Sequence, residues 1–223
     1  MRWVRDNSLS LFFAAILLAA LVAMAFVGHS EFNHDQLAHS GATISFWRYV
    51  TSSSFAVDVM ENWQSEYLQF TLYVVATVWF VQRGSSESKE PGEEGRGEDE
   101  EQLLGEHTKP NSPKWAKAGG WRTAVFSRSM FIVMTTIWLA TWAAQAIAGR
   151  IDYNAAQLDH REAALSLWQY VGSSDFWDRT LQNWQSEFLA VGSFAVFAVF
   201  LRQRGSPESK PVGAPHSTTG SEV

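Results

Sequence analysis

The chain contains no cysteine, and this absence excludes two classes of protein. A four-helix thiol oxidoreductase needs a redox-active cysteine, and an extracytoplasmic domain held by disulfides needs cysteine pairs. The sequence also lacks a phosphate-binding glycine loop, a Gly-x-Ser-x-Gly nucleophile elbow and a His-Glu-x-x-His zinc motif. We therefore expect a protein that is not an enzyme and has no resident cofactor.

Charge is absent from two long stretches of the chain, residues 9–27 and 130–148. Each stretch has about 19 residues, which as a helix crosses the roughly 30 Å hydrocarbon core of a membrane. Two shorter apolar stretches, residues 67–81 and 188–201, end close to arginines. The overall composition, 46% apolar with a net charge of −6, conceals this uneven distribution. The pattern predicts four membrane-spanning helices.

One sequence occurs twice. Residues 28–89 recur as residues 149–210 without a gap, and roughly 28 of 62 positions are identical. The retained pieces include Asn-Trp-Gln-Ser-Glu at 62–66 and 183–187, and Gln-Arg-Gly-Ser-x-Glu-Ser-Lys at 82–89 and 203–210. The repeat also bears on residues 9–27, which could be read as a cleaved secretory signal. Their counterpart lies in mid-chain, so we expect both to be retained.

The predicted fold is an all-α membrane protein in which four transmembrane helices form two parallel helical-hairpin repeats with amphipathic outer helices. The first repeat covers residues 1–84, with spans at about 8–28 and 62–82 and an outer helical segment at 29–61. A disordered acidic linker follows at 85–120. The second repeat covers 121–205, with spans at about 129–149 and 183–202 and an outer segment at 150–182, before a disordered tail at 206–223.

The distribution of lysine and arginine along the chain predicts the orientation of these spans. They are frequent before the first span, in the linker and in the tail, and rare in the two outer segments. Because such residues favour the cytoplasmic side, both termini and the linker are predicted to be cytoplasmic. Each repeat contains two spans, so both repeats enter the membrane in the same direction and are related by an axis along the membrane normal.

The outer segments are predicted to be helical. Residues 42–50 place Ile44 and Trp47 on one side, as in a helix lying at the headgroup level. Serines before Phe55 and Phe176 are typical helix caps, and each following helix is expected to run unbroken into the second or fourth span. The chain has 11 tryptophans, many of them near predicted span ends, which is typical of interfacial anchors.

A repeated polar cluster lies at the outer end of the second and fourth spans. A carboxylate in hydrocarbon is costly, so its glutamates should face the bundle interior, water or a partner. Three interpretations follow: a hydrogen-bonded outer cap, an ion or proton path in which the two glutamates share a cation or proton, and a metal site completed by two equivalent histidines. The cluster consists of Asn62, Trp63, Glu66, Asn183, Trp184 and Glu187, and the histidines are His39 and His160.

The second repeated motif begins at the cytoplasmic ends of the same spans. Arg83 and Arg204 are predicted to anchor these ends, where a cation complements the helix dipole and reaches the headgroups. Gly84 and Gly205 suit the left-handed residue that ends a helix. Local structure leaves the Ser/Glu/Lys remainder unassigned, and docking on a cytoplasmic partner is one interpretation.

The two motifs, with the opening Arg-Trp-Val-Arg-Asp-Asn, resemble a family of small bacterial membrane proteins defined as a domain of unknown function. The resemblance covers nearly the whole chain except the linker and the tail. It implies an α-helical, multi-pass protein of the bacterial inner membrane, and it implies no activity. We expect a non-enzymatic structural or interaction component of the envelope. The alternatives are a small cation or proton conductor that uses Glu66 and Glu187, and a metal-dependent membrane enzyme. Expected partners are the lipid bilayer and a protein partner or second copy, with no nucleic acid.

Overall fold

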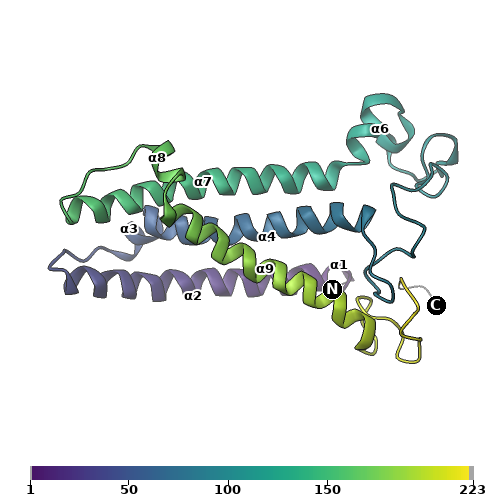
Figure 1. Ribbon diagram of the computed structural model, residues 1–223, viewed down its shortest axis with the longest axis horizontal. Helices are drawn as coiled ribbons and strands as arrows, with labels where there is room; N and C mark the ends of the chain where they lie inside the picture. Colours follow the sequence, from purple (N-terminus) through teal and green to yellow (C-terminus); the bar gives the residue numbers. More distant parts are fainter. Residues whose placement is uncertain (1, 221–223) are drawn as a thin grey trace. The chain divides into compact units, whose positions relative to one another are not determined.

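The computed structural model describes residues 2–220, and within this range every regular element is a helix, so the all-α prediction is confirmed. Figure 1 traces the elements in chain order. They are α1 (Arg2–Asp6), α2 (Ser8–Ala38), α3 (Phe46–Val50), α4 (Ser53–Trp79), the short 3-10 helix η1 (Gly105–His107), α5 (Lys114–Lys117), α6 (Gly120–Phe126), α7 (Ser129–Asp159), α8 (Leu167–Val171) and α9 (Ser174–Phe200).

The chain divides into two compact units. The first unit comprises the chain up to Met60 together with Ala144–Gly172. The second unit comprises Glu61–Ala143 and the chain from Ser173 onward. The boundaries fall within α4 and α7 and just before α9. The first unit therefore holds α2 and most of the two predicted outer segments, and the second holds the greater part of α4 and all of α9.

Two helices of the described chain, α2 and α7, are long and apolar enough to cross a membrane. Each has 31 residues, and at 1.5 Å per residue each is about 46 Å long, more than a hydrocarbon core requires. The predicted spans ended at residues 28 and 149, whereas the helices continue to Ala38 and Asp159. The extensions carry charged residues but neither proline nor glycine after Gly28 and Gly149, so nothing local ends the helix there.

The helices α4 and α9 do not meet the same criterion, so the four predicted spans are not all supported. Each has 27 residues, and the first half of each is rich in charge. The uncharged part of α4, from Tyr67 to Trp79, has a length of about 20 Å, which is short of a full crossing. The helix also ends at Trp79 and not at the predicted residue 82.

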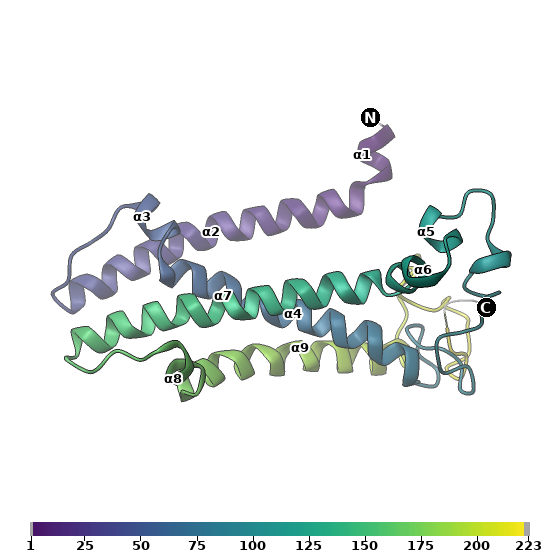
Figure 2. The same cartoon turned by 90° about the horizontal axis from the view of Figure 1, so that it is seen from above.

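Within the first unit, the chain after α2 folds back so that α3 packs beside its C-terminal half (Figure 2). A two-bond clamp holds the connection: Asn33 Nδ2 donates to the Ile44 carbonyl at 3.0 Å, and Ile44 N donates to Asn33 Oδ1 at 2.8 Å. The same clamp joins α7 to the segment before α8, where Asn154 makes both bonds to Leu165, at 2.9 and 2.8 Å. The two clamps are 121 residues apart.

A buried tyrosine packs inside each of these two connections. Tyr49 is 3% exposed and Tyr170 is 0% exposed. Their hydroxyl groups press against Gly28 and Gly149, where an added Cβ would collide with the phenol. The predicted flat helix over residues 42–50 is therefore wrong in extent. It begins only at Phe46, because the clamp at Ile44 and the Ser45 cap precede it.

The serine caps are confirmed. The Ser52 hydroxyl accepts from Phe55 N at 3.3 Å, and the Ser173 hydroxyl accepts from Phe176 N at 3.4 Å. Both α4 and α9 then run without a break. The predicted disordered linker at 85–120 consists of turns with η1 and α5, and Lys89 Nζ donates to the Gly95 carbonyl at 2.6 Å within it.

Candidate functional site

The repeated Asn-Trp-Gln-Ser-Glu motifs meet where α9 lies beside α4 in the second unit. The Trp184 indole Nε1 donates to Gln64 Oε1 at 2.9 Å. Gln64 is 0% exposed, and Gln64 Nε2 donates to the Glu61 carbonyl at 3.1 Å. The sequence analysis named Trp184 but missed Gln64. The pattern that could have identified it is the buried face formed by Gln64, Leu68 and Thr71 at helical spacing.

An ion pair joins the same two helices one turn before the motifs. Arg179 Nη1 lies 3.2 Å from Glu61 Oε2, and Arg179 Nε lies 3.6 Å from Asp175 Oδ2. The residues at the equivalent positions of the other copy are Asp58 for Arg179 and Gln182 for Glu61, so the two copies differ in charge here. This pairing therefore depends on the divergence of the copies and not on their likeness.

The predicted glutamates Glu66 and Glu187 lie on different helices and interact electrostatically. The Ser65 hydroxyl lies within hydrogen-bonding reach of the Glu187 carboxylate, and Glu66 acts on Glu187 electrostatically. Ser65 is buried and also donates to the Asn62 carbonyl at 2.8 Å, while Glu66 is exposed. Ser65 and Glu66 of α4 are therefore the groups that act on Glu187 of α9.

The remaining members of the predicted cluster serve their own helices. Asn183 Nδ2 donates to the Arg179 carbonyl at 2.9 Å, one turn earlier in α9. Asn62 and Trp63 are exposed. The predicted cluster is thus divided: Trp184 and Glu187 face α4, Asn183 bonds within α9, and Asn62 and Trp63 face outward.

Aromatic rings fill the space next to this contact. Trp142 lies about 6.0 Å from each of Phe176, Trp177 and Trp184, measured between ring centroids, and it stacks on Trp138 at 5.8 Å. Such centroid distances are those of packed aromatic pairs. The rings therefore stabilise α7 against α9 within the second unit.

The predicted metal ligands are not assembled into a site. His39 and His160 are both exposed, each just beyond the end of its helix. His39 Nδ1 lies 3.3 Å from Asp35 Oδ1 on the preceding turn. Among residues 2–220, no group of three or more histidine, aspartate or glutamate side chains is arranged to hold a metal ion.

The two Gln-Arg-Gly-Ser-x-Glu-Ser-Lys segments, named here the first loop (residues 82–89) and the second loop (residues 203–210), have the same internal bonds. In the first loop Gln82 N donates to Ser88 Oγ at 2.8 Å, and Glu87 N donates to Ser85 Oγ at 3.2 Å. In the second loop the equivalent distances are 2.9 and 3.2 Å. Gly84 and Gly205 have the predicted left-handed φ values, 85° and 84°. The prediction that they end the helices is wrong, because α4 and α9 end at Trp79 and Phe200 and the glycines lie in the turns of the two loops. The serines that the sequence analysis left unassigned therefore bond the loop to itself.

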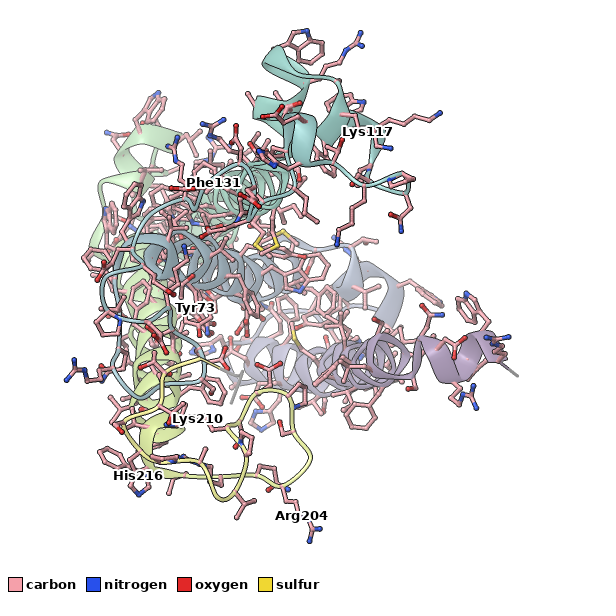
Figure 3. The ribbon with its side chains drawn as sticks, turned by 90° about the vertical axis from the view of Figure 1, so that its right-hand side faces the viewer. Tyr73, Lys117, Phe131, Arg204, Lys210 and His216 are labelled. Carbon is pink, nitrogen blue, oxygen red and sulfur yellow. The ribbon has the colours of Figure 1, made fainter. Side chains whose placement is uncertain are left out.

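Lys210 is the most deeply buried charged side chain of these loops, and Figure 3 shows it within the folded tail. It is 1% exposed, and its Nζ donates to the carbonyls of Gly84, Thr218 (2.8 Å), His216 (3.1 Å) and Pro215 (3.3 Å). The predicted disordered tail thus folds back over the first loop. Arg204 is exposed and projects outward, and Arg83 is exposed as well. Both lie beyond the ends of α4 and α9, at Trp79 and Phe200, and their role as anchors stays a prediction.

The first loop also contains a perturbed carboxylate. Burial raises the pKa of Glu87, and the neighbouring negative charge of Glu208 raises it further. Hydrogen bonds from Tyr73 and Ser86 act in the opposite direction. Tyr73 Oη lies 3.2 Å from Glu87 Oε2, so the end of α4 is bonded directly to the loop that follows it.

A family model described as a domain of unknown function, DUF6766, matches residues 1–221. No curated protein and no solved structure matches the chain.

Proposed function

The chain belongs to the DUF6766 family, a domain of unknown function, and from this premise we propose that it is a non-enzymatic structural or interaction component of the bacterial inner membrane. The proposal places four helices across the bilayer as two parallel hairpin repeats, with both termini in the cytoplasm. It rests on the family, on the apolar helices and on the contacts of the repeated motifs.

One observation supports a scaffold above a reactive site: the buried polar groups of the repeated motif are used in packing. Gln64, which is buried, accepts from Trp184, and just outside the motif the partly exposed Arg179 pairs with Glu61 and Asp175. A buried polar group that is fully bonded to its neighbours specifies one arrangement of helices. These groups make the polar contacts between α4 and α9.

The membrane location is supported by the surfaces of α2 and α7. Large apolar side chains of α2, among them Leu9, Phe13 and Leu18, are more than half exposed. Within the described chain nothing covers them, and exposed apolar surface of this extent marks a contact with lipid or with another protein. Lipid is the proposed contact.

Two tryptophans lie at the level where these apolar stretches end. Trp47 on α3 is 76% exposed and Trp168 on α8 is 81% exposed. Their helices pack where the uncharged stretches of α2 and α7 give way to charge: Phe46 stacks on Phe26 at 4.6 Å, and Tyr170 packs on Tyr153 at 5.6 Å. Tryptophan is enriched at this depth of a bilayer. We assign both residues to the outer interface.

The electrostatic interaction between Glu66 and Glu187 supports one alternative, a cation or proton conductor. Two carboxylates close together hold a proton or a cation more readily than one. The test is ion flux through proteoliposomes that contain the chain or its Glu66→Gln/Glu187→Gln variant. A scaffold gives no flux above empty liposomes in either case. Flux in the parent chain that disappears in a folded variant would replace the scaffold with the conductor.

A further inference from the structure

The two loops are alike in sequence and in internal bonding, yet the chain's own tail covers one of them. Two hydrogen bonds join the tail to backbone groups of the first loop: Gly84 N donates to Thr219 Oγ1 at 2.9 Å, and Gly220 N donates to the Ser85 carbonyl at 2.9 Å. Lys210 adds a third bond to the Gly84 carbonyl. Gly84 and Ser85 are buried as a result.

The tail can pack closely on Gly84 because glycine has no side chain. An added Cβ at this position would collide with the backbone carbonyl oxygen of His216. His216 in turn bonds the end of α9, where its Nδ1 lies 3.1 Å from the Val199 carbonyl oxygen. The tail therefore folds through turns and is held to the first loop largely by backbone groups, and backbone bonding of this kind is used in peptide recognition.

The second loop presents the same groups without a covering segment. Gly205 and Arg204 are exposed, and among the described residues no atom lies within 4 Å of the position of a Cβ on Gly205. The loop lines a hollow together with Pro211 and Val212. Exposed backbone groups of a loop need a bonding partner, which is water here or another chain.

We propose that the second loop, centred on Gly205 and Ser206, docks a peptide segment of a partner protein that carries a serine or threonine followed by glycine. The hydroxyl accepts from Gly205 N, and the backbone N–H of the next residue donates to the Ser206 carbonyl. These are the bonds that Thr219 and Gly220 make to the first loop.

A second copy of the chain is the less favourable occupant. Its tail already occupies its own first loop. Because tail and loop belong to the same chain, the tail is present at a high effective concentration at that loop. Docking on the neighbour's second loop would break one set of bonds in order to form an equivalent set. A separate partner protein forms the bonds at the second loop without that loss.

The experiment uses a fluorescent synthetic peptide with the sequence of residues 210–220, titrated into the full chain in nanodiscs and followed by fluorescence anisotropy. We expect saturable binding of one peptide per chain, because the tethered tail excludes the peptide from the first loop. A peptide with the T219V change keeps its shape but loses the hydroxyl acceptor. It should bind about five- to tenfold more weakly, the effect of one hydrogen bond.

The two loop glycines provide matched protein variants. Gly205→Ala should abolish binding of the peptide. Gly84→Ala should not abolish it, although the tail released from the first loop then competes for the second loop and weakens the peptide's apparent affinity. The opposite pattern would show that the peptide displaces the tail from the first loop, and it would overturn the proposal. Absence of binding, or equal binding of the T219V peptide, would also overturn it. Concentration-dependent self-association of the chain that is lost on Thr219→Val would assign the second loop to a second copy.

This inference rests on the proposed role as an interaction component, since it names the class of partner. The docking proposal and the proposed function can be contradicted independently of each other. A chain that spans the membrane but does not bind the peptide remains a scaffold without this docking site, whereas a chain that does not span the membrane contradicts the proposed function whatever the peptide does.

Discussion

Gln64 and Gln185 occupy equivalent positions in the two copies of the motif but have different environments. Gln64 is fully buried and bonds to Trp184, whereas Gln185 is exposed. An unpaired donor in a buried place costs more than a lost bond at the surface, because it also loses its contact with water. The pair therefore separates the effect of the site from the effect of the residue type.

Replacing Gln64 by leucine should lower the free energy of unfolding by about 1 to 3 kcal/mol, because it leaves the Trp184 indole N–H without its acceptor. Gln185→Leu should change it by less than about 0.5 kcal/mol, as is usual at a surface position. Denaturant unfolding in detergent micelles, followed by tryptophan fluorescence, measures both. Equal losses in the two variants would mean that the bond between α4 and α9 contributes nothing.

The raised pKa of Glu87 predicts a pH dependence that is local to the first loop. A carboxyl group whose pKa is higher in the folded state than in the unfolded state binds more protons when folded. Folding of the loop is therefore less favourable at neutral pH and becomes more favourable as the pH falls through the raised pKa toward the usual glutamate range. Hydrogen exchange of the Ser85 and Glu87 amides, corrected for intrinsic rates, should show more protection near pH 5 than near pH 7.

Glu87→Gln should remove this dependence, because the amide carries no charge and still accepts from Tyr73. Glu208→Gln should weaken it, since Glu208 is the second cause of the shift. Protection that is unchanged between the two pH values in the parent chain would contradict the assignment.

At the scale of elements, the asparagine clamps determine where α3 and α8 begin. Asn33 holds Ile44 and Asn154 holds Leu165 through the same two bonds. The first clamp has additional support, because His29 Nε2 lies 2.7 Å from the Ile44 carbonyl oxygen. Arg150 stands at the position equivalent to His29.

Asn33→Ala should speed hydrogen exchange of the Ile44 amide, and Asn154→Ala should speed that of Leu165. Each amide loses its acceptor, so an increase of about tenfold is expected. The increase should be larger at Leu165, since His29 still holds the Ile44 carbonyl in the first variant. Each variant is the control for the other, and an Asn33→Ala change that acts equally on Leu165 would contradict two separate clamps.

At the scale of the whole molecule, the number of spans is the property that most needs a direct measurement. The chain has no cysteine, so single cysteines introduced at Ser40, Ser112, Ala163 and Ser217 can be labelled without background. Four spans predict that a membrane-impermeant thiol reagent added outside intact cells labels positions 40 and 163, and not 112 or 217. Two spans, α2 and α7 alone, predict labelling at 40 and 112 instead.

A cysteine at Leu18 is the control for span depth, since it should resist the reagent from both sides. Positions 112 and 163 discriminate between the models, because both change sides between them. Labelling at 112 from outside would contradict the parallel hairpins and the cytoplasmic linker, and would leave α4 and α9 on the membrane surface.

Local patterns in the amino-acid sequence were sufficient for the helical class, the serine caps of α4 and α9, and the left-handed glycines at 84 and 205. These features depend on a few neighbouring residues, whose bonds close within one or two turns. Helix ends were less predictable. Residues 29–38 are polar enough to suggest an outer segment, yet they simply continue α2.

Contacts between distant residues could not be read from such patterns. Gln64 and Gln185 have the same neighbours in sequence, as do the first and second loops, so no local rule tells one from the other. Their environments differ because the packing of α4 against α9 buries one glutamine, and because a single tail can cover only one of two equivalent loops. The sequence therefore determines the local structure of each repeated segment. Contacts between residues about 120 positions apart determine which of the two copies is buried.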